Sequence, residues 1–83
     1  MSASDQITNS QTGRVRSVRG SVIDARFPEH LPEVHHKLVT GAGDRIVVEV
    51  VSHVDDETVR GMALTSTQGL ARGAAIRDTG HPV

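Results

Sequence analysis

The sequence predicts an all-β fold, a small closed barrel of five or six short strands, and three observations support this. From residue 13 onward, short runs rich in β-branched residues alternate with Gly, Pro and Asp. No stretch shows a sustained apolar period of 3.6 residues with helix caps. A chain of 83 residues hides its sheet edges best by closure, so a barrel is favoured over a sandwich.

The composition bounds the class of protein. Hydrophobic residues make up 36% of the chain, charged residues make up 23%, and the net charge is −1. That balance argues against bulk electrostatic binding to nucleic acid. The chain has no cysteine, no apolar run of the roughly 20 residues that span a bilayer, and no secretory signal at its start. An intracellular soluble domain is expected, with residues 1–12 as a disordered polar tail and residues 13–83 as the barrel.

The first predicted strand covers residues 13–20. Arg14 and Arg16 flank Val15, and the alternation then slips by one residue at Ser17. A one-residue slip near a glycine predicts a β-bulge, which bends a barrel strand.

The second predicted strand, residues 21–27, alternates cleanly and ends at Pro28. Its apolar side chains share one face: Ile23, Ala25 and Phe27. Phe27 is the only aromatic residue of the chain, so Val, Ile, Leu and Ala must supply the rest of the core.

The third and fourth strands follow a loop that contains two prolines. A short extended segment is expected over residues 34–39, and a turn over residues 41–44 leads into residues 45–53. This run is apolar on both faces: Ile46, Val48 and Val50 on one, Val47 and Val51 on the other. Such a strand is either central or covered by a partner.

Two further strands complete the chain. An acidic turn over residues 55–57 connects the fourth strand to residues 58–64 as a hairpin, and the last strand is expected over residues 74–78.

The segment 65–73, TSTQGLARG, has the glycines and hydroxyl residues of a phosphate-binding loop. Its spacing does not match G-x-x-x-x-G-K-[ST], and no helix is predicted to follow. We interpret it as a turn in which Gly69 and Gly73 adopt positive φ and Leu70 enters the barrel end.

Five histidines (His30, His35, His36, His53 and His81) raise the question of a metal site. Adjacent His35 and His36 point to opposite faces of an extended chain and do not easily share an ion. Surface histidines are therefore favoured, with His53 at the solvated end of its strand. No metal-binding residue is predicted.

Two charged groups have structural interpretations. Asp55, Asp56 and Glu57 are expected to form a solvated hairpin tip rather than a cation site or a catalytic pair. Arg14, Arg16 and Arg19 lack interleaved aromatic residues, so a solvated or subunit-facing strand is favoured over a nucleic-acid platform. No catalytic nucleophile–base set and no cofactor-binding residue is predicted, and an independent enzyme is the weakest hypothesis.

The motifs, taken in order, resemble the N-terminal barrel of F-type ATP synthase β subunits over residues 12–83. The family pattern has a G-x-V-x-x-V-x-G start, then V-I-D-A-x-F, T-V-R, S-T-x-G-L-x-R-G and D-T-G. The positions that match it are Gly13, Val15, Val18, Gly20, Val22, Ile23, Asp24, Ala25, Phe27, Thr58, Val59, Arg60, Ser66, Thr67, Gly69, Leu70, Arg72, Gly73, Asp78, Thr79 and Gly80. Gly61 departs from the pattern, since Thr is commoner there. The sequence around Gly61 is similar to that of a divergent bacterial type of β subunit, which is sometimes linked to sodium transport.

The resemblance implies a closed six-stranded antiparallel barrel that packs beside α-subunit barrels in an alternating hexameric ring. It implies a rotary ATP synthase or ATPase coupled to proton or sodium flow, at the cytoplasmic face of the bacterial membrane without direct insertion. ATP, ADP and Mg²⁺ are expected in a nucleotide-binding domain beyond Val83, so this segment carries no catalytic, cofactor or metal residue. Val47, Val51 and the Arg14/Arg16 side are the expected neighbour contacts. The alternative function is a free-standing OB-like barrel that binds nucleic acid.

Overall fold

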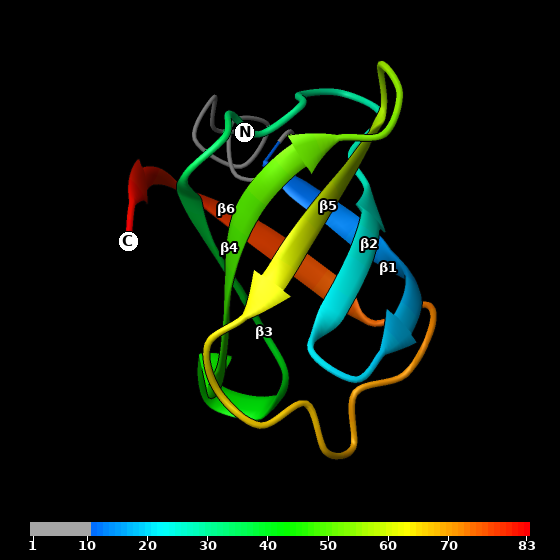
Figure 1. Cartoon of the computed structure of the whole chain (residues 1–83), viewed down its shortest axis with the longest axis vertical. Coiled ribbons are helices and arrows are strands. Elements are labelled where there is room, and N and C mark those ends of the chain that lie inside the picture. The colour runs from blue at the N-terminus through cyan, green and yellow to red at the C-terminus, as the bar shows by residue number, and fades with distance from the viewer. Residues whose placement is uncertain (1–10) are drawn as a thin grey trace, which may run out of the picture.

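Six strands close into one barrel in the computed structural model, which describes residues 11–83 (Figure 1). They are β1 (Thr12–Arg19), β2 (Val22–Arg26), β3 (His36–Thr40), β4 (Ile46–His53), β5 (Thr58–Ala63) and β6 (Ala75–Pro82). The order around the barrel is β1-β2-β5-β4-β3-β6, and every neighbouring pair is antiparallel. The predicted closed six-stranded antiparallel barrel is confirmed. In the described part of the chain, no helix has the length and apolar character needed to cross a bilayer.

Strand boundaries differ from the prediction at three places. β3 begins at His36, two residues later than expected, because the preceding loop continues to His35 with φ of 78°. β6 continues past Asp78 to Pro82 by pairing with the start of β3, and Gly80 adopts φ of 79° on the way. The predicted tail over residues 1–12 lies mostly outside the described residues, but Thr12 already belongs to β1 and pairs with Arg77.

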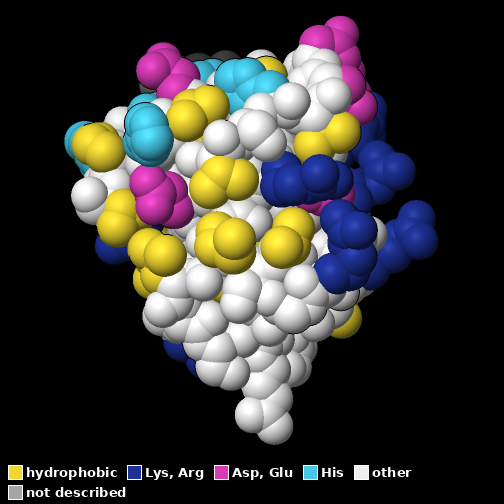
Figure 2. All heavy atoms as spheres, in the orientation of Figure 1, with side chains coloured by type: hydrophobic (Ala, Val, Ile, Leu, Met, Phe, Trp, Pro, Cys, Tyr) yellow, Lys and Arg dark blue, Asp and Glu magenta, His cyan; other side chains and the backbone are white. Residues whose placement is uncertain are grey.

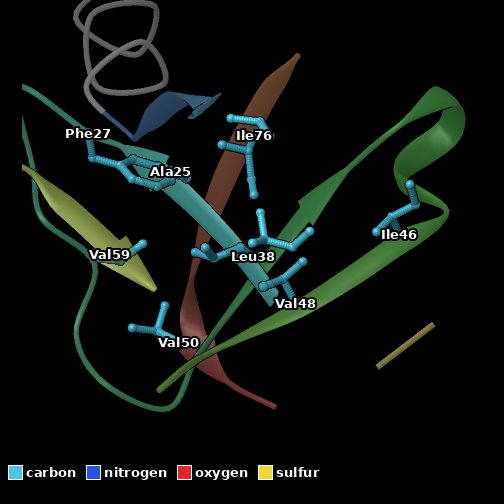
Figure 3. Packing of buried hydrophobic residues seen from close by; sticks show 10 residues of the cluster. Ala25, Phe27, Leu38, Ile46, Val48, Val50, Val59 and Ile76 are labelled. Atoms are coloured by element: carbon cyan, nitrogen blue, oxygen red, sulfur yellow. The ribbon is translucent and has the colours of Figure 1, made fainter. Parts of the chain in front are cut away.

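The barrel interior is filled by aliphatic side chains packed around one aromatic side chain, that of Phe27 (Figure 3). The predicted alternation is confirmed in β2 and β4, whose inward residues are at most 1% exposed. The buried cluster consists of Val15, Ile23, Ala25, Phe27, Leu38, Ile46, Val48, Val50, Val59 and Ile76. Because most strands contribute inward residues at every second position, closure buries this inward-facing cluster, while β3 buries three consecutive residues, Leu38, Val39 and Thr40.

Three register shifts bend the strands around this core, one of them in β3 between His36 and Leu38, opposite β6. The predicted bulge in β1 is confirmed, since the pairing with β2 shifts between Val15 and Ser17. Another shift lies in β4 between Val50 and Ser52, opposite β5. Bulges of this kind increase local twist, which a barrel of short strands needs in order to close.

Gly61 fits its position because a side chain there has no room. It lies between Ile23 of β2 and Val50 of β4 in the sheet, and an added Cβ would overlap the Val48 side chain. The departure from the commoner Thr is therefore matched to the packing of this barrel's own core.

Candidate functional site

An exposed apolar surface crosses the outer faces of β2, β5 and β4, and we call it the apolar band. It consists of Val22, Val47, Val51, Met62 and Leu64. Figure 2 shows apolar side chains gathered across the middle of this side of the barrel, with basic side chains, in dark blue, beside them. Val51, Met62 and Leu64 are 45%, 42% and 50% exposed.

Register brings the apolar band together from segments that are distant in sequence. Met62 pairs with Val22 on one side and with Glu49 on the other. The Leu64 amide donates to the Val47 carbonyl oxygen at 2.8 Å. Contiguous exposed apolar residues of this kind mark sites of protein contact, since isolated ones are ordinary on any surface.

Val47 and Val51 lie where the sequence predicted them, on the outer face of β4. Val51 is half-exposed and Val47 partly exposed, so nothing within residues 11–83 covers this face completely. Of the two alternatives left by the sequence, a strand covered by a partner fits this face better than a strand buried on both sides.

An ion-pair cluster borders the apolar band on β2 and β5. Arg60 donates from Nε and Nη2 to the two carboxylate oxygens of Asp24, at 2.9 and 3.0 Å, and Arg19 lies 3.8 Å from the same carboxylate. The hydrogen bonds from Arg60 lower the pKa of Asp24 below its usual 3.8, against the opposing effect of burial. The bidentate pair fixes the orientation of the Arg60 guanidinium, while 42% of the side chain remains exposed.

A second surface, which we call the arginine face, lies on β1 and β2 and in the loop before β6. It consists of Arg14, Arg16, Arg26 and Arg72. The first three line a surface hollow of about 550 Å³ together with Glu29, and a second hollow of about 350 Å³ is lined by Arg16 and Arg72 together with Asp24 and Asp55. Arg14 pairs directly with Arg26 across the two strands.

Carboxylates lie among the arginines of this face. Arg26 pairs with Glu57 at 2.7 Å, and Arg14 donates to the Gly73 carbonyl oxygen at 3.3 Å. Asp55 lines the second hollow, and its pKa is lowered mainly by the Glu57 backbone amide, with a smaller contribution from Arg16. The arrangement supplies guanidinium groups that can donate hydrogen bonds to further carboxylates.

The histidines divide between separate partners. His35 Nδ1 lies 3.2 Å from Glu49, whereas His36 Nδ1 lies 3.1 Å from the fully buried Asp78 carboxylate. The two neighbours therefore face different partners, as the alternation of an extended chain predicted. The prediction of surface histidines is wrong for His36, whose side chain is only 18% exposed, because β3 pairs with β6 and carries it against Asp78.

The remaining histidines also have protein partners or lie in solvent. His30 Nε2 lies 3.3 Å from Asp78, and His53 Nε2 lies 2.8 Å from the Pro32 carbonyl oxygen, while His81 is exposed. Nitrogens of both His30 and His36 therefore lie within 3.3 Å of the Asp78 carboxylate. Over residues 11–83 no group of three or more side chains is arranged to hold a metal.

The acidic turn is the tip of the β4–β5 hairpin, as predicted. Asp55 and Asp56 are exposed, and the Glu57 amide donates to Asp55 Oδ1 at 2.9 Å. Glu57 is the exception to a purely solvated tip, because its carboxylate reaches back to Arg26.

The segment 65–73 is a turn, as the sequence predicted. Gly69 and Gly73 adopt φ of 85° and 93°, and Leu70 packs against the core from the barrel end. The Thr67 hydroxyl donates to the Gly20 carbonyl oxygen at 3.1 Å, which ties this loop to the β1–β2 turn. Both lie at the lower end of the barrel in Figure 1.

Sequence reasoning did not identify Val22, Met62, Leu64, Arg26 or Arg72 as surface contacts. Arg26, Leu64 and Arg72 lie next to residues that were identified, but only across a strand pair or between loops, and Val22 and Met62 lie opposite each other. The only sequence signal for such residues is an outward position in a predicted alternating strand. That position does not tell which residue of a neighbouring strand lies beside it.

Comparison with known proteins gives a consistent result. A family model described as the ATP synthase alpha/beta family, beta-barrel domain, matches residues 15–80. ATP synthase subunit beta 2 of Chlorobium luteolum is 49% identical over 71 residues, which cover 86% of this chain and 15% of that protein. The corresponding subunit of Polaromonas naphthalenivorans is 55% identical over 71 residues, with the same coverage. ATP synthase subunit beta 1 of a Marinomonas species is 48% identical over 81 residues, 92% of this chain and 17% of that protein. The chain therefore spans about a sixth of the length of these relatives.

Proposed function

The chain belongs to the ATP synthase alpha/beta family, and from this premise we propose that it is the N-terminal barrel of a rotary ATP synthase β subunit. In this proposal the barrel is an assembly module that packs against α-subunit barrels in an alternating hexameric ring. The parent subunit makes or hydrolyses ATP, coupled to proton or sodium flow, as part of a complex attached to the cytoplasmic face of a membrane. ATP, ADP and Mg²⁺ bind in a nucleotide-binding domain outside this chain.

The apolar band is the observation that carries the assembly role. Three of its side chains are 42–50% exposed although the barrel core beneath them is complete. Covering apolar surface is favourable by roughly 25 cal/mol per Å², so a neighbour that buries the band gains affinity. Arg60 lies at the border of the band on β5, whereas Glu49 lies within it, between Val47 and Val51 and opposite Met62, so the band combines apolar side chains with a polar group, as protein interfaces do.

The nucleic-acid alternative has less support. Proteins that bind single strands stack bases on exposed aromatic side chains, whereas Phe27 is the only aromatic residue and is 1% exposed. The net charge of −1 gives no general attraction for a polyanion.

Association with the α subunit tests the proposal. The chain should bind purified α subunit, and Met62→Gln combined with Leu64→Gln should weaken binding by about tenfold, because apolar anchors at an interface contribute more than about 1.4 kcal/mol. Val54→Gln is the matched control, since Val54 is 48% exposed at the hairpin tip and outside the apolar band. Undiminished binding by the double variant, or no binding by the unmodified chain, would contradict the proposal.

A second experiment tests the assignment of nucleotide chemistry to another domain. Calorimetric titration of the chain with Mg-ATP should give no binding heat at micromolar concentrations. Magnesium-dependent binding in that range would place a nucleotide site in this segment and overturn the assignment.

A further inference from the structure

Arg60 extends from the outer face of β5 at the border of the apolar band. In the sheet it lies between Asp24 of β2 and Ser52 of β4, two positions before Met62 on the same face. Its Nε and Nη2 donate to the two Asp24 carboxylate oxygens at 2.9 and 3.0 Å, which fixes the plane of the guanidinium. Because the side chain is 42% exposed, part of it remains available to a neighbour.

The guanidinium group of Arg60 has more donors than Asp24 uses. A guanidinium carries five N–H groups, and only the two that donate to Asp24 have a hydrogen-bond partner within residues 11–83. Water accepts from the others while this surface is exposed. A neighbour that covers the apolar band displaces this water, and a buried donor without an acceptor costs free energy. The covering surface must therefore place acceptor oxygens beside Arg60.

The charges around Arg60 favour a neutral acceptor over a second carboxylate. The hydrogen bonds from Arg60 lower the pKa of Asp24, so this carboxylate is ionised at neutral pH and balances the guanidinium. Arg19 also lies 3.8 Å from Asp24, but its side chain is 63% exposed. Glu49, the acidic residue within the apolar band, contacts His35 at 3.2 Å. A carboxylate from a neighbour would be desolvated close to the charge of Asp24, whereas a neutral carbonyl oxygen avoids that cost.

The pair with Asp24 also prepares Arg60 for binding. A free surface arginine loses rotamer entropy when a partner orders it, and this loss subtracts from the affinity. Arg60 is already held in one orientation by two hydrogen bonds within the barrel. Arginines next to buried apolar anchors are among the residues that contribute most to binding at protein interfaces. Arg60, beside Met62 and already oriented, has both properties.

From these observations we propose that Arg60 anchors the neighbouring α subunit at the apolar band by donating hydrogen bonds to neutral carbonyl oxygens of that subunit. Asp24 is the positioning residue that presents the guanidinium group. This inference rests on the proposed assembly role, to which it adds one anchoring residue and the chemistry of the group that it binds. Because the contact joins a balanced ion pair to a neutral acceptor, it should depend little on salt.

Substitutions of Arg60 in the full chain, measured against purified α subunit, test the anchor. Arg60→Gln should weaken binding by about tenfold, and Arg60→Lys by nearly as much, because lysine keeps the charge but not the planar set of donors. Arg77→Gln is the matched control and should change binding by less than about twofold. Arg77 pairs with Asp44 at 3.0 Å and is 43% exposed, but it lies on β6, which is separated from β5 by two strands in either direction.

A double-mutant cycle tests the positioning role of Asp24. Asp24→Asn should weaken binding by about threefold in the unmodified chain, because it releases the orientation of Arg60, and by less than about 1.5-fold when Arg60 is already Gln. Circular dichroism of each variant shows whether the barrel is folded. Equal losses from Asp24→Asn in both backgrounds would show that Asp24 acts on binding without Arg60, which contradicts the positioning role.

The outcomes separate this inference from the proposed function. No binding of α subunit by the unmodified chain would overturn the assembly role itself. Binding that Met62→Gln with Leu64→Gln weakens, but that Arg60→Gln and Arg60→Lys leave unchanged, would overturn the anchor and leave the assembly role standing. Affinity of the unmodified chain should change by less than about threefold between about 50 and about 500 mM salt. A steep decrease with salt, together with full binding by Arg60→Lys, would make the partner group a carboxylate and contradict the inference.

Discussion

Neighbouring valines of β4 occupy opposite environments. Val48 and Val50 face the interior and are 0% exposed, whereas Val51 faces outward and is 45% exposed. The residue type is the same, and a single step along the strand decides whether the side chain belongs to the core or to the apolar band. The comparison separates two roles in one strand: the inward valines stabilise the fold, and the outward valines are available to a partner.

The two outer surfaces extend this contrast. The interior is aliphatic on every strand, so it does not distinguish one side of the barrel from the other. The outside differs by side, with the apolar band on β2, β5 and β4 and the arginine face around β1 (Figure 2). Stability is therefore expected to respond to inward substitutions, and association to outward ones.

The largest expected effect is that of removing the single aromatic ring. Phe27→Ala should lower the free energy of unfolding by about 3–5 kcal/mol, because it leaves a cavity in a core with no other aromatic side chain. Met62→Ala, on the outer face, should change it by less than about 0.5 kcal/mol. Urea unfolding followed by far-ultraviolet circular dichroism measures both, since the chain has no Trp or Tyr for fluorescence. Equal losses in the two variants would remove the distinction between inside and outside.

A matched pair of valine substitutions sharpens the comparison within β4. Val50→Thr places a hydroxyl in the apolar core and should cost about 1–3 kcal/mol of stability. Val51→Thr should leave stability within about 0.5 kcal/mol, while it weakens binding of α subunit. Denaturant midpoints and binding titrations on the same two proteins provide the measurements. A destabilised Val51→Thr variant would show that this face already supports the fold of the chain.

The smallest expected effect concerns the Asp24–Arg60 pair between core and surface. The folded-state pKa of Asp24 lies below its usual 3.8, so the pair stabilises the fold above about pH 4, and this contribution is lost as pH falls through the folded-state pKa. Asp24→Asn should therefore lower stability at pH 7 and reduce the loss of stability below pH 4. The change at pH 7 should be at most about 1 kcal/mol, as for other partly exposed ion pairs.

Arg60→Gln and the double variant complete this test. Because each substitution removes the same pair, the stability changes of the single variants should not add in the double variant. Additive changes, or an acid profile of Asp24→Asn that matches the unmodified chain, would show that the pair does not contribute.

Much of the fold could be predicted from residue patterns. Alternation placed Ile23, Ala25 and Phe27 inside, and the slip at Ser17 located the bulge. The end of β6 could not be predicted, because Gly80 and Pro82 favour turns locally and continue the strand only by pairing with β3.

The surfaces could be predicted only in part, for a related reason. Val47, Val51, Arg14 and Arg16 were identified from their own strands, since each faces away from buried neighbours. Met62 and Arg26 depend on which strand lies beside which, and His36 depends on a carboxylate 42 residues away.

By itself, the sequence determined the strand content, the faces of the central strands, the turn chemistry of Gly69 and Gly73, and the family, whose motifs match residues along the chain. These properties follow from local periodicity and residue type, which act over a few neighbouring positions. Tertiary structure decided the strand order, the contiguity of the apolar band, the clustering of the arginines and the burial of Asp78 with its histidines. Those depend on closure of the barrel, which brings residues far apart in sequence into contact and sets which outward side chains share a surface.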